Sequence, residues 1–325
     1  YVAAIYGANG VAKQGYASVA VALAAVLDGE TISVSNVTGD ESGTSVDFDR
    51  EGDIAFTITG TAPNYKMPIV TFADKDGSGG KITVTIKDAT LVMAEIDARQ
   101  NATVNVIDST IDGKGNNDIV KSYFNGAINI SGTSKIDTMQ VTTTGYITIS
   151  DTAELTATWQ TSVLCNGLIT VSPGATFNTG ALQLTGKAYS GRDNTDADRV
   201  GKPAAIIVDG AALNIGTNVY SSTGADYNYR SYTHGVNIGT EAGKSVVLDI
   251  KNASKVVIGQ ASSGSSTYNG KVTFGEGATV NVTGGSTLTV YDRGTDGVTL
   301  TNQGTVALDS ASSITSTSFN SADGT

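Results

Sequence analysis

Ile128-Asn-Ile-Ser-Gly-Thr-Ser-Lys-Ile136 is the stretch of sequence that decides the fold, because variants of it recur along the chain. The phrase has two apolar residues around a polar one, three polar or small residues, a small residue, any residue and a final apolar residue. Full copies also begin at Ile147, Ile169, Leu248, Val272 and Val298, and copies one residue shorter begin at Val84, Val104 and Ile206. Internal repetition of this kind is the sequence signature of a solenoid.

The interval between copies indicates which solenoid. From Val84 onward, the starts lie 19 to 26 residues apart, except for two intervals of 37 and 42 residues. A helix-free repeat of about this length is the size of one coil of a parallel β-helix. Because side chains alternate along a strand, the paired apolar residues would point inward and the residue between them outward. The seventh, small residue would lie at a crowded turn. The sequence predicts an all-β, right-handed parallel β-helix.

Two other folds fit less well. A leucine-rich repeat has a similar period, but its Leu/Asn framework is missing and the apolar positions hold Ile, Val and Phe. An antiparallel sandwich would show turn signals every 8 to 12 residues or so, instead of one nine-residue phrase at a longer interval.

Composition excludes several functions. The 325 residues carry 20 basic and 31 acidic side chains, a net charge of −11, without the basic stripe that phosphate contacts need. Nucleic-acid binding is therefore not expected, nor is membrane insertion of this segment, since no long apolar run is present. The single cysteine, Cys165, excludes an intrachain disulfide, and we expect a small buried residue instead of a nucleophile. The chain starts and stops within repeats, which favours a piece of a longer, secreted protein.

The N-terminal residues differ from the repeat. Asn9-Gly10 is a strong hairpin turn signal. Ser18 can cap a short helix that has Val19, Leu23 and Val26 on one face and ends at Gly29. We predict that residues 1–30 form an N-terminal cap of hairpin plus helix, which covers the exposed end of a β-helix over residues 31–325.

The stretch from Gly15-Tyr-Ala-Ser-Val through Glu30-Thr-Ile-Ser-Val34 resembles the capping segment that opens many right-handed parallel β-helix proteins. These include pectin-lyase-like proteins and large bacterial surface adhesins. The close resemblance covers about twenty residues, and the rest of the chain is similar only in its style of repeat. It implies the fold and an extracellular, cell-surface location in bacteria. It does not imply an activity, because the fold carries enzymes and non-catalytic proteins alike.

The repeat is interrupted at three places, and these interruptions are the predicted functional site. The predicted insertions are 186–203, 217–244 and 260–270, and each follows an apolar-x-apolar stretch that ends at or near a glycine. We expect the three loops to leave the coil at the same place and to lie side by side. Tyr and Arg are typical of binding surfaces, and Asp and Arg beside aromatic rings suit sugars. The candidate ligand-binding residues are Tyr189, Arg192, Asp193, Tyr220, Tyr227, Tyr229, Arg230, Tyr232, His234 and Tyr268.

Two motifs suggest other chemistry. Asn194-Thr-Asp196 and His234-Gly235 are similar to parts of the polygalacturonase signature, which would make Asp196, Asp198 and His234 catalytic. The Asp-Asp pair and the Arg-x-Lys of that family are missing here, so the acid and base that inverting hydrolysis needs are incomplete.

Asp74 and Asp76 lie in a turn that resembles a truncated calcium loop without its later ligands. No cofactor is therefore predicted, with calcium at these aspartates as the alternative.

These observations favour a non-catalytic function. We expect an extracellular bacterial adhesin or structural rod whose Tyr/Asp/Arg-rich loops bind a glycan or a cell-surface partner. The first alternative is a polysaccharide-degrading hydrolase or lyase. The second is a self-assembling filament or surface-layer subunit, which would self-associate through its last coil.

Overall fold

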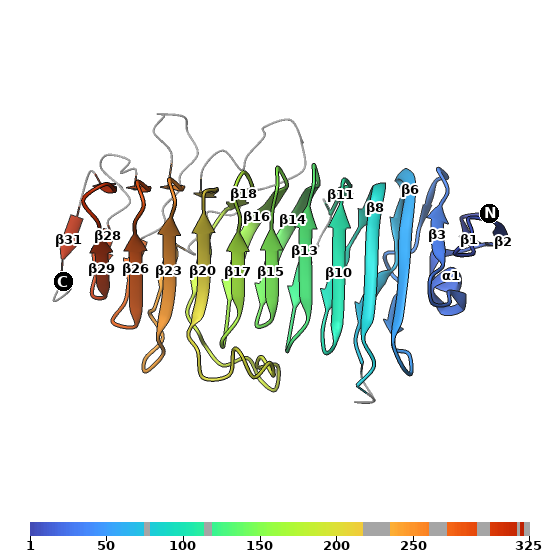
Figure 1. Ribbon diagram of the computed structural model, residues 1–325, viewed down its shortest axis with the longest axis horizontal. Coiled ribbons are helices and arrows are strands. Elements are labelled where there is room, and N and C mark those ends of the chain that lie inside the picture. The colour runs from blue at the N-terminus through green and yellow to red at the C-terminus, as the bar shows by residue number, and fades with distance from the viewer. Residues whose placement is uncertain are drawn as a thin grey trace. The chain divides into compact units, whose positions relative to one another are not determined.

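The computed structural model describes residues 1–74, 79–113, 119–216, 235–259, 272–290, 300–316 and 319–321. It confirms an all-β parallel solenoid (Figure 1), with α1 as the single helix in these ranges. The chain divides into two compact units, Tyr1–Leu155 and Thr156–Thr325.

The first unit begins with an antiparallel hairpin and the helix, and continues as parallel strands. Its elements are β1 (Ala3–Tyr6), β2 (Ala12–Tyr16), α1 (Val19–Ala25), β3 (Thr31–Val34), β4 (Gly39–Asp40), β5 (Ser45–Phe48), β6 (Ile54–Met67), β7 (Ile69–Phe72), β8 (Ile82–Met93), β9 (Glu95–Ala98), β10 (Ala102–Ile107), β11 (Thr110–Asp112), β12 (Ile119–Ser122), β13 (Ala127–Ser131), β14 (Lys135–Thr143) and β15 (Tyr146–Ile149).

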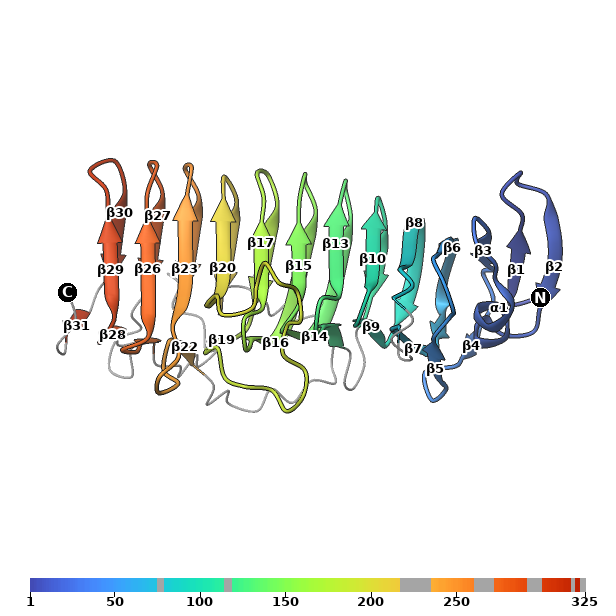
Figure 2. The same cartoon turned by 60° about the horizontal axis from the view of Figure 1, so that its bottom comes forward.

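The second unit repeats a coil of three strands, so that each strand pairs with the third strand after it. Its strands are β16 (Glu154–Val163, which begins in the first unit), β17 (Leu168–Val171), β18 (Thr176–Thr179), β19 (Leu182–Leu184), β20 (Ala204–Asp209), β21 (Ala212–Ile215), β22 (Val236–Ile238), β23 (Val246–Lys251), β24 (Lys255–Ile258), β25 (Val272–Phe274), β26 (Ala278–Val282), β27 (Thr287–Val290), β28 (Leu300–Asn302), β29 (Thr305–Leu308), β30 (Ser313–Ser316) and β31 (Phe319–Ser321). The strands β17, β20, β23, β26 and β29 lie side by side in this unit (Figure 2).

The N-terminal hairpin and helix are confirmed, but α1 ends at Ala25, before the predicted end at Gly29, because Val26 already has an extended backbone. β2 pairs with β1, and β1 pairs antiparallel with β3, the first strand of the parallel stack. The Ser18 side chain accepts a hydrogen bond from Val21 N at 3.1 Å, and the carboxylate of Glu41 accepts bonds from Val19 N and Ala20 N. At the other end of α1, the Arg50 guanidinium donates to the carbonyls of Leu23 and Ala24. Charges of both signs therefore complement the two helix ends.

The paired apolar residues of the phrase face the core, as predicted. Ile128 and Ile130 are fully buried, and Ile128 pairs with Val104 and Ile147 in the neighbouring coils of the first unit. This stacking of identical positions is what the repeat encodes.

One copy of the phrase occupies a different place in the coil. The copy at Val272 begins on β25, the third strand of its coil, and Val272 pairs with Val236 and Leu300. The residue that stacks on Leu248 is instead Val280. The copy at Val298 begins outside the described residues. The same phrase thus forms two different turns, which the sequence spacing alone did not separate.

The small seventh residue of the phrase is buried at a turn, as predicted, and serine has a further role there. In the second unit, Ser254 Oγ accepts a hydrogen bond from Ala211 N at 3.2 Å, and Ser286 Oγ accepts one from Ser254 N at 3.1 Å. Ser312 Oγ continues the column by accepting from Ser286 N at 3.1 Å. The buried backbone N–H of one coil thus donates to the serine hydroxyl of the next coil. A larger side chain at this turn would not allow the two groups to approach.

Candidate functional site

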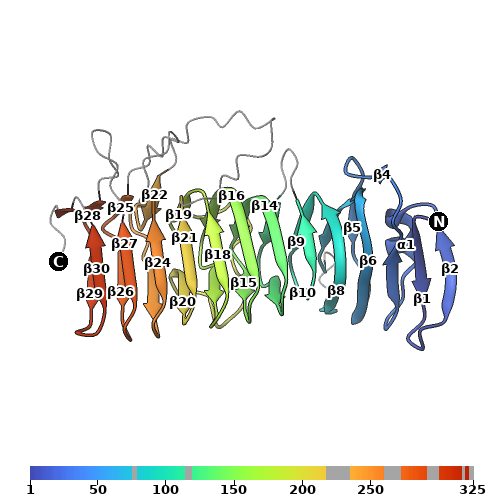
Figure 3. The same ribbon diagram turned by 90° about the horizontal axis from the view of Figure 1, so that it is seen from above.

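The insert 186–203 joins β19 to β20, at the end of the third strand of its coil. The other two predicted insertions follow second strands, β21 and β24, which stack with Leu213 opposite Val256 (Figure 3). β19 stacks instead on β22, with Leu182 opposite Val236. The prediction that all three loops leave the coil at the same place is therefore wrong. The coil also resumes at β22, inside the range 217–244, before the predicted end of that insertion.

Asn166 and Arg199 hold the insert against the coil below it. Arg199 Nε donates to the Asn166 carbonyl at 2.9 Å, and its Nη2 donates to the carbonyl of Pro203. In return, Asn166 Nδ2 donates to the Arg199 carbonyl at 2.8 Å. These reciprocal bonds fix the C-terminal end of the insert, and a bond from Cys165 N to the Lys187 carbonyl fixes its N-terminal end. Arg199 is thus used for structure, a role that its loop position did not reveal.

The Asn194-Thr-Asp196 motif forms consecutive side-chain turns. Asn194 Oδ1 accepts a bond from Asp196 N, and Asp196 Oδ1 accepts one from Asp198 N, both at 2.9 Å. Such turns are the usual local role of Asn and Asp in loops. His234, the third predicted catalytic residue of the hydrolase alternative, lies outside the described residues, so that alternative stays a prediction.

Cys165, in the coil, forms a small polar cluster with Asp193 and Tyr189 of the insert. Cys165 Sγ lies 2.8 Å from Asp193 Oδ1 and accepts a hydrogen bond from Tyr189 N at 3.2 Å. The thiol is half-exposed instead of buried as expected. Burial and the hydrogen bond to the Asp193 carboxylate raise the pKa of Cys165 to about 12. The Arg192 guanidinium lies over the Tyr189 ring, 5.2 Å from its centroid.

We expect Cys165 to react slowly with iodoacetamide in the folded protein. A thiol of pKa about 12 has roughly a thousandfold less thiolate at pH 8 than one near the ordinary value of about 8.5. Asp193→Asn removes the carboxylate that disfavours the thiolate, so the variant should react faster. Mass spectrometry of timed samples measures both rates, with urea-unfolded protein as the control. Equal rates for folded and unfolded protein would contradict this assignment.

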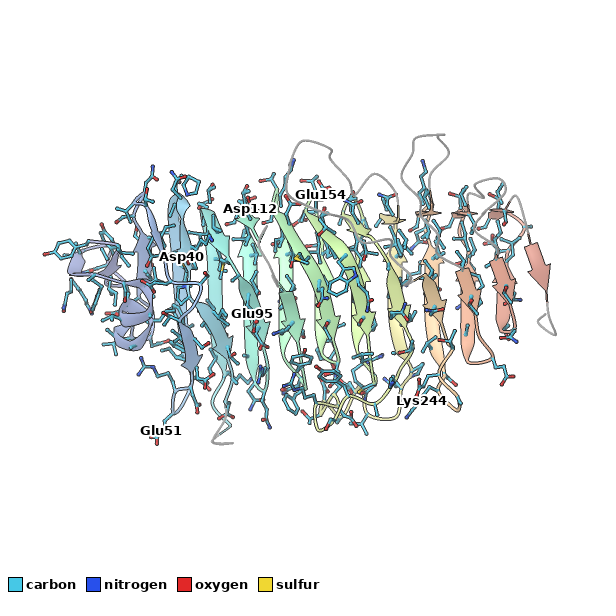
Figure 4. The ribbon with its side chains drawn as sticks, turned by 180° about the vertical axis from the view of Figure 1, so that it is seen from behind. Asp40, Glu51, Glu95, Asp112, Glu154 and Lys244 are labelled. Atoms are coloured by element: carbon cyan, nitrogen blue, oxygen red, sulfur yellow. The ribbon has the colours of Figure 1, made fainter. Side chains whose placement is uncertain are left out.

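A cavity of about 490 Å³ opens beside the insert. Its lining combines Cys165 and Asp193 of the polar cluster with two lysines, Lys202 and Lys244, and also includes Asn166 and Pro203. Lys244, in the turn before β23, is drawn at the same edge of the second unit as the insert (Figure 4).

A second cavity of about 560 Å³ adjoins the first and shares Gly243, Lys244 and Ser245 with it. Three of its lining glycines, Gly239, Gly275 and Gly277, which we call the glycine floor, have no room for a side chain. A Cβ at Gly239 would overlap Ala278 N, and a Cβ at Gly275 would overlap the Gly239 carbonyl oxygen. We call the two cavities together the turn groove, because their lining residues come from successive turns between third and first strands.

The predicted ligand-binding residues divide into two groups. Tyr189, Arg192 and Asp193 lie together in the described insert, and Tyr189 is 36% exposed. Seven others lie outside the described residues: Tyr220, Tyr227, Tyr229, Arg230, Tyr232, His234 and Tyr268.

Asp74, one of the two weak calcium candidates, is fully buried, and its Oδ2 accepts bonds from Gly79 N and Asn101 Nδ2. Asp76 is outside the described ranges, where calcium binding stays a prediction.

Sequence reasoning missed a charged cluster in the first unit. Lys121 Nζ lies 2.8 Å from Glu95 Oε2, and Arg99 donates from Nε and Nη2 to Oδ2 of the fully buried Asp97. Asp97 Oδ1 has no hydrogen-bond partner. The available signal was Glu95-Ile-Asp97-Ala-Arg99, which places three charges on one face of a strand. Glu95 is labelled in Figure 4.

The charged groups of this cluster shift one another's pKa values. Burial and the neighbouring Asp97 carboxylate raise the pKa of Glu95 against the opposing effect of Lys121. Burial lowers the pKa of Arg99, but Asp97 raises it more, so the guanidinium stays charged. The two carboxyl groups interact directly, which differs from the separated acid pair of glycoside hydrolases.

Searches for metal and membrane features within the described ranges found neither. No group of three or more His, Cys, Asp or Glu side chains there could hold a metal ion. None of the helices in the same part of the chain has the length and apolar character needed to span a membrane. Comparison with protein-family models, curated proteins and solved structures gave no match to this chain.

Proposed function

We propose that this chain is a non-catalytic bacterial surface protein that binds a saccharide in the turn groove. The observation that carries the proposal is the continuous groove of two cavities beside a loop whose ends are fixed by hydrogen bonds. Binding sites are commonly concave and largely preformed, with a few directed polar groups. The fixed insert supplies such groups without the cost of ordering a free loop.

The chemistry of the groove suits sugars. In the insert beside the groove, Tyr189 offers part of an aromatic ring next to the Arg192 guanidinium. The groove lining itself supplies the amide of Asn166 and the amines of Lys202 and Lys244. A sugar ring stacks its CH face on an aromatic ring while its hydroxyls pair with amide, amine and carboxylate groups. Tyr and Arg supply much of the binding energy at such surfaces.

The acidic groups next to the groove favour binding over catalysis. Asp193 is bonded to the Cys165 thiol, and Asp196 supports the turn that contains Asp198. The polysaccharide-degrading enzyme and the self-assembling filament stay as alternatives.

The cell-surface location rests on the resemblance of residues 15–34 to surface-protein caps. Antibody labelling of intact source cells tests it, and labelling only after permeabilisation would sink it.

A glycan array tests saccharide binding. We expect ligands that bind the wild-type protein and lose about tenfold in affinity, close to 1.4 kcal/mol, on Tyr189→Ala or Lys244→Ala. Matched controls are Tyr1→Ala, on a tyrosine that is 89% exposed in the first unit, and Lys255→Ala on β24. These controls should bind as the wild type does. An array without hits, or hits indifferent to both groove variants, would refute the proposal.

A further inference from the structure

The turn groove is longer than a single sugar. Its lining comes from five successive turns, represented by Asn166, Lys202, Lys244, Gly275 and Gln303. Neighbouring parallel strands lie about 4.8 Å apart, so four steps between five turns span roughly 19 Å. Gly243, Lys244 and Ser245 line both cavities, so one ligand can pass from the first to the second. The occupant that fits this shape is an extended chain.

The glycine floor forms part of this path. A Cβ on Gly239, Gly275 or Gly277 would overlap backbone atoms of neighbouring residues. At these three positions the second cavity is therefore bounded by backbone, and side chains that include Glu241, Glu276 and Gln303 line the rest. A ligand there meets peptide groups below and charged side chains at the rims.

The charges along the groove change sign. Lys202 lines only the cavity beside the insert, as does Asp193, whose carboxylate accepts a hydrogen bond from the Cys165 thiol. Lys244 lines both cavities. Glu241 and Glu276 line only the other cavity, together with the uncharged Gln303. A ligand with negative groups along its whole length would be attracted at one end and repelled at the other. A neutral chain would gain hydrogen bonds but no charge–charge attraction from the two lysines.

From this shape and charge pattern, we infer that the groove binds a linear oligosaccharide that has an acidic residue at one end and uncharged residues along the rest. Its carboxylate lies between Lys202 and Lys244, and its uncharged residues cross the glycine floor past Glu241 and Glu276. This inference rests on the proposed saccharide binding and adds the length and charge pattern of the ligand. A uniformly acidic polymer is excluded as the preferred ligand.

The test compares three oligosaccharides of equal length by calorimetry with the full chain. The mixed probe has one glucuronate at the end of a chain of N-acetylglucosamine, the acidic probe contains only galacturonate, and the neutral probe contains only glucose. We expect the mixed probe to bind at least about tenfold more tightly than the other two. Added salt should weaken binding of the mixed probe, since salt screens exposed charge pairs. An acidic or neutral probe that binds as tightly as the mixed probe would overturn the inference.

Variants at the two ends of the groove test the charge pattern separately. Lys202→Ala should lower the affinity for the mixed probe much more than the affinity for the neutral probe. Glu276→Gln should raise the affinity for the acidic probe about threefold, which corresponds to the energy of one exposed charge interaction. Glu51→Gln, at an exposed site in the first unit, is the matched control and should change neither. An unchanged acidic-probe affinity in Glu276→Gln would also overturn the inference.

The outcomes separate this inference from the proposed function. If the acidic or neutral probe binds best and Lys244→Ala weakens it, saccharide binding in the groove stands and the inferred charge pattern falls. If no probe binds and the array is also empty, both fall together.

Discussion

Gly277→Ala is expected to destabilise the protein by about 3 kcal/mol, because the added methyl group has no space. A Cβ at Gly277 would overlap the carbonyl oxygen of Lys244, which is backbone and cannot rotate away. Ala278 N bonds to the Gly275 carbonyl in the same turn, so the turn cannot shift without losing that bond. Displacing the Lys244 backbone should also weaken ligand binding in the groove. Urea denaturation measures the change in the free energy of unfolding.

Gly43→Ala is the matched control for this substitution. A Cβ at Gly43 meets nothing within 4 Å, and the backbone there is not left-handed. Alanine at such a position should be neutral or slightly stabilising, because it restricts the unfolded chain. If Gly277→Ala is as stable as Gly43→Ala, the close approach of the turns at the groove floor is not real.

Arg99→Leu is expected to destabilise the first unit by about 3 kcal/mol or more, because it leaves a buried carboxylate unpaired. Asp97 is fully buried, and both of its hydrogen bonds from side chains come from Arg99 to a single oxygen. Removal of Arg99 would leave the Asp97 carboxylate without the cation that donates these hydrogen bonds. Thermal and urea unfolding of the variant measure the loss.

The double variant Asp97→Asn/Arg99→Leu distinguishes the pair from simple loss of packing. Removing both charges abolishes the unpaired buried carboxylate, so the double variant should recover most of the stability that Arg99→Leu loses. Contacting residues commonly show such non-additivity in double-mutant cycles. Additive losses would mean that the ion pair is not coupled as the structure indicates.

The fold was predictable because the repeat encodes local structure and stacking at once. Ile128 and Ile130 specify a strand by their alternation, and the same positions in the next coil specify its register. The cap was predictable for a similar reason, since Ser18 and the apolar positions Val19, Leu23 and Val26 encode α1 directly.

The phase of the repeat was not predictable from the phrase. Apolar-x-apolar followed by a tight turn occurs after first strands, as at Leu248, and after third strands, as at Val272. Both turns have room only for small residues, so their sequences are similar. The loop exits were confused for this reason, because Leu182 and Leu213 belong to different faces of the coil.

The candidate site was predictable only in part. The insert was visible as a gap in the repeat, and Tyr189 and Arg192 do lie together in it. Lys202, Lys244 and Glu276 were not singled out, because they are brought together by stacked turns that are far apart in sequence. The buried Asp97 was missed because its side chain occupies an outward position of a strand, where alternation predicts exposure.

Hydrogen–deuterium exchange with a bound oligosaccharide tests the central claim most directly. The turn-groove account predicts that a ligand found on the array slows amide exchange in the insert 186–203, in the turn 239–245 and in the turn 275–277. Lys244→Ala should abolish this protection at the same ligand concentration, and Lys255→Ala should keep it. Protection confined to residues outside these three segments would contradict the claim that the turn groove is where this protein holds its ligand.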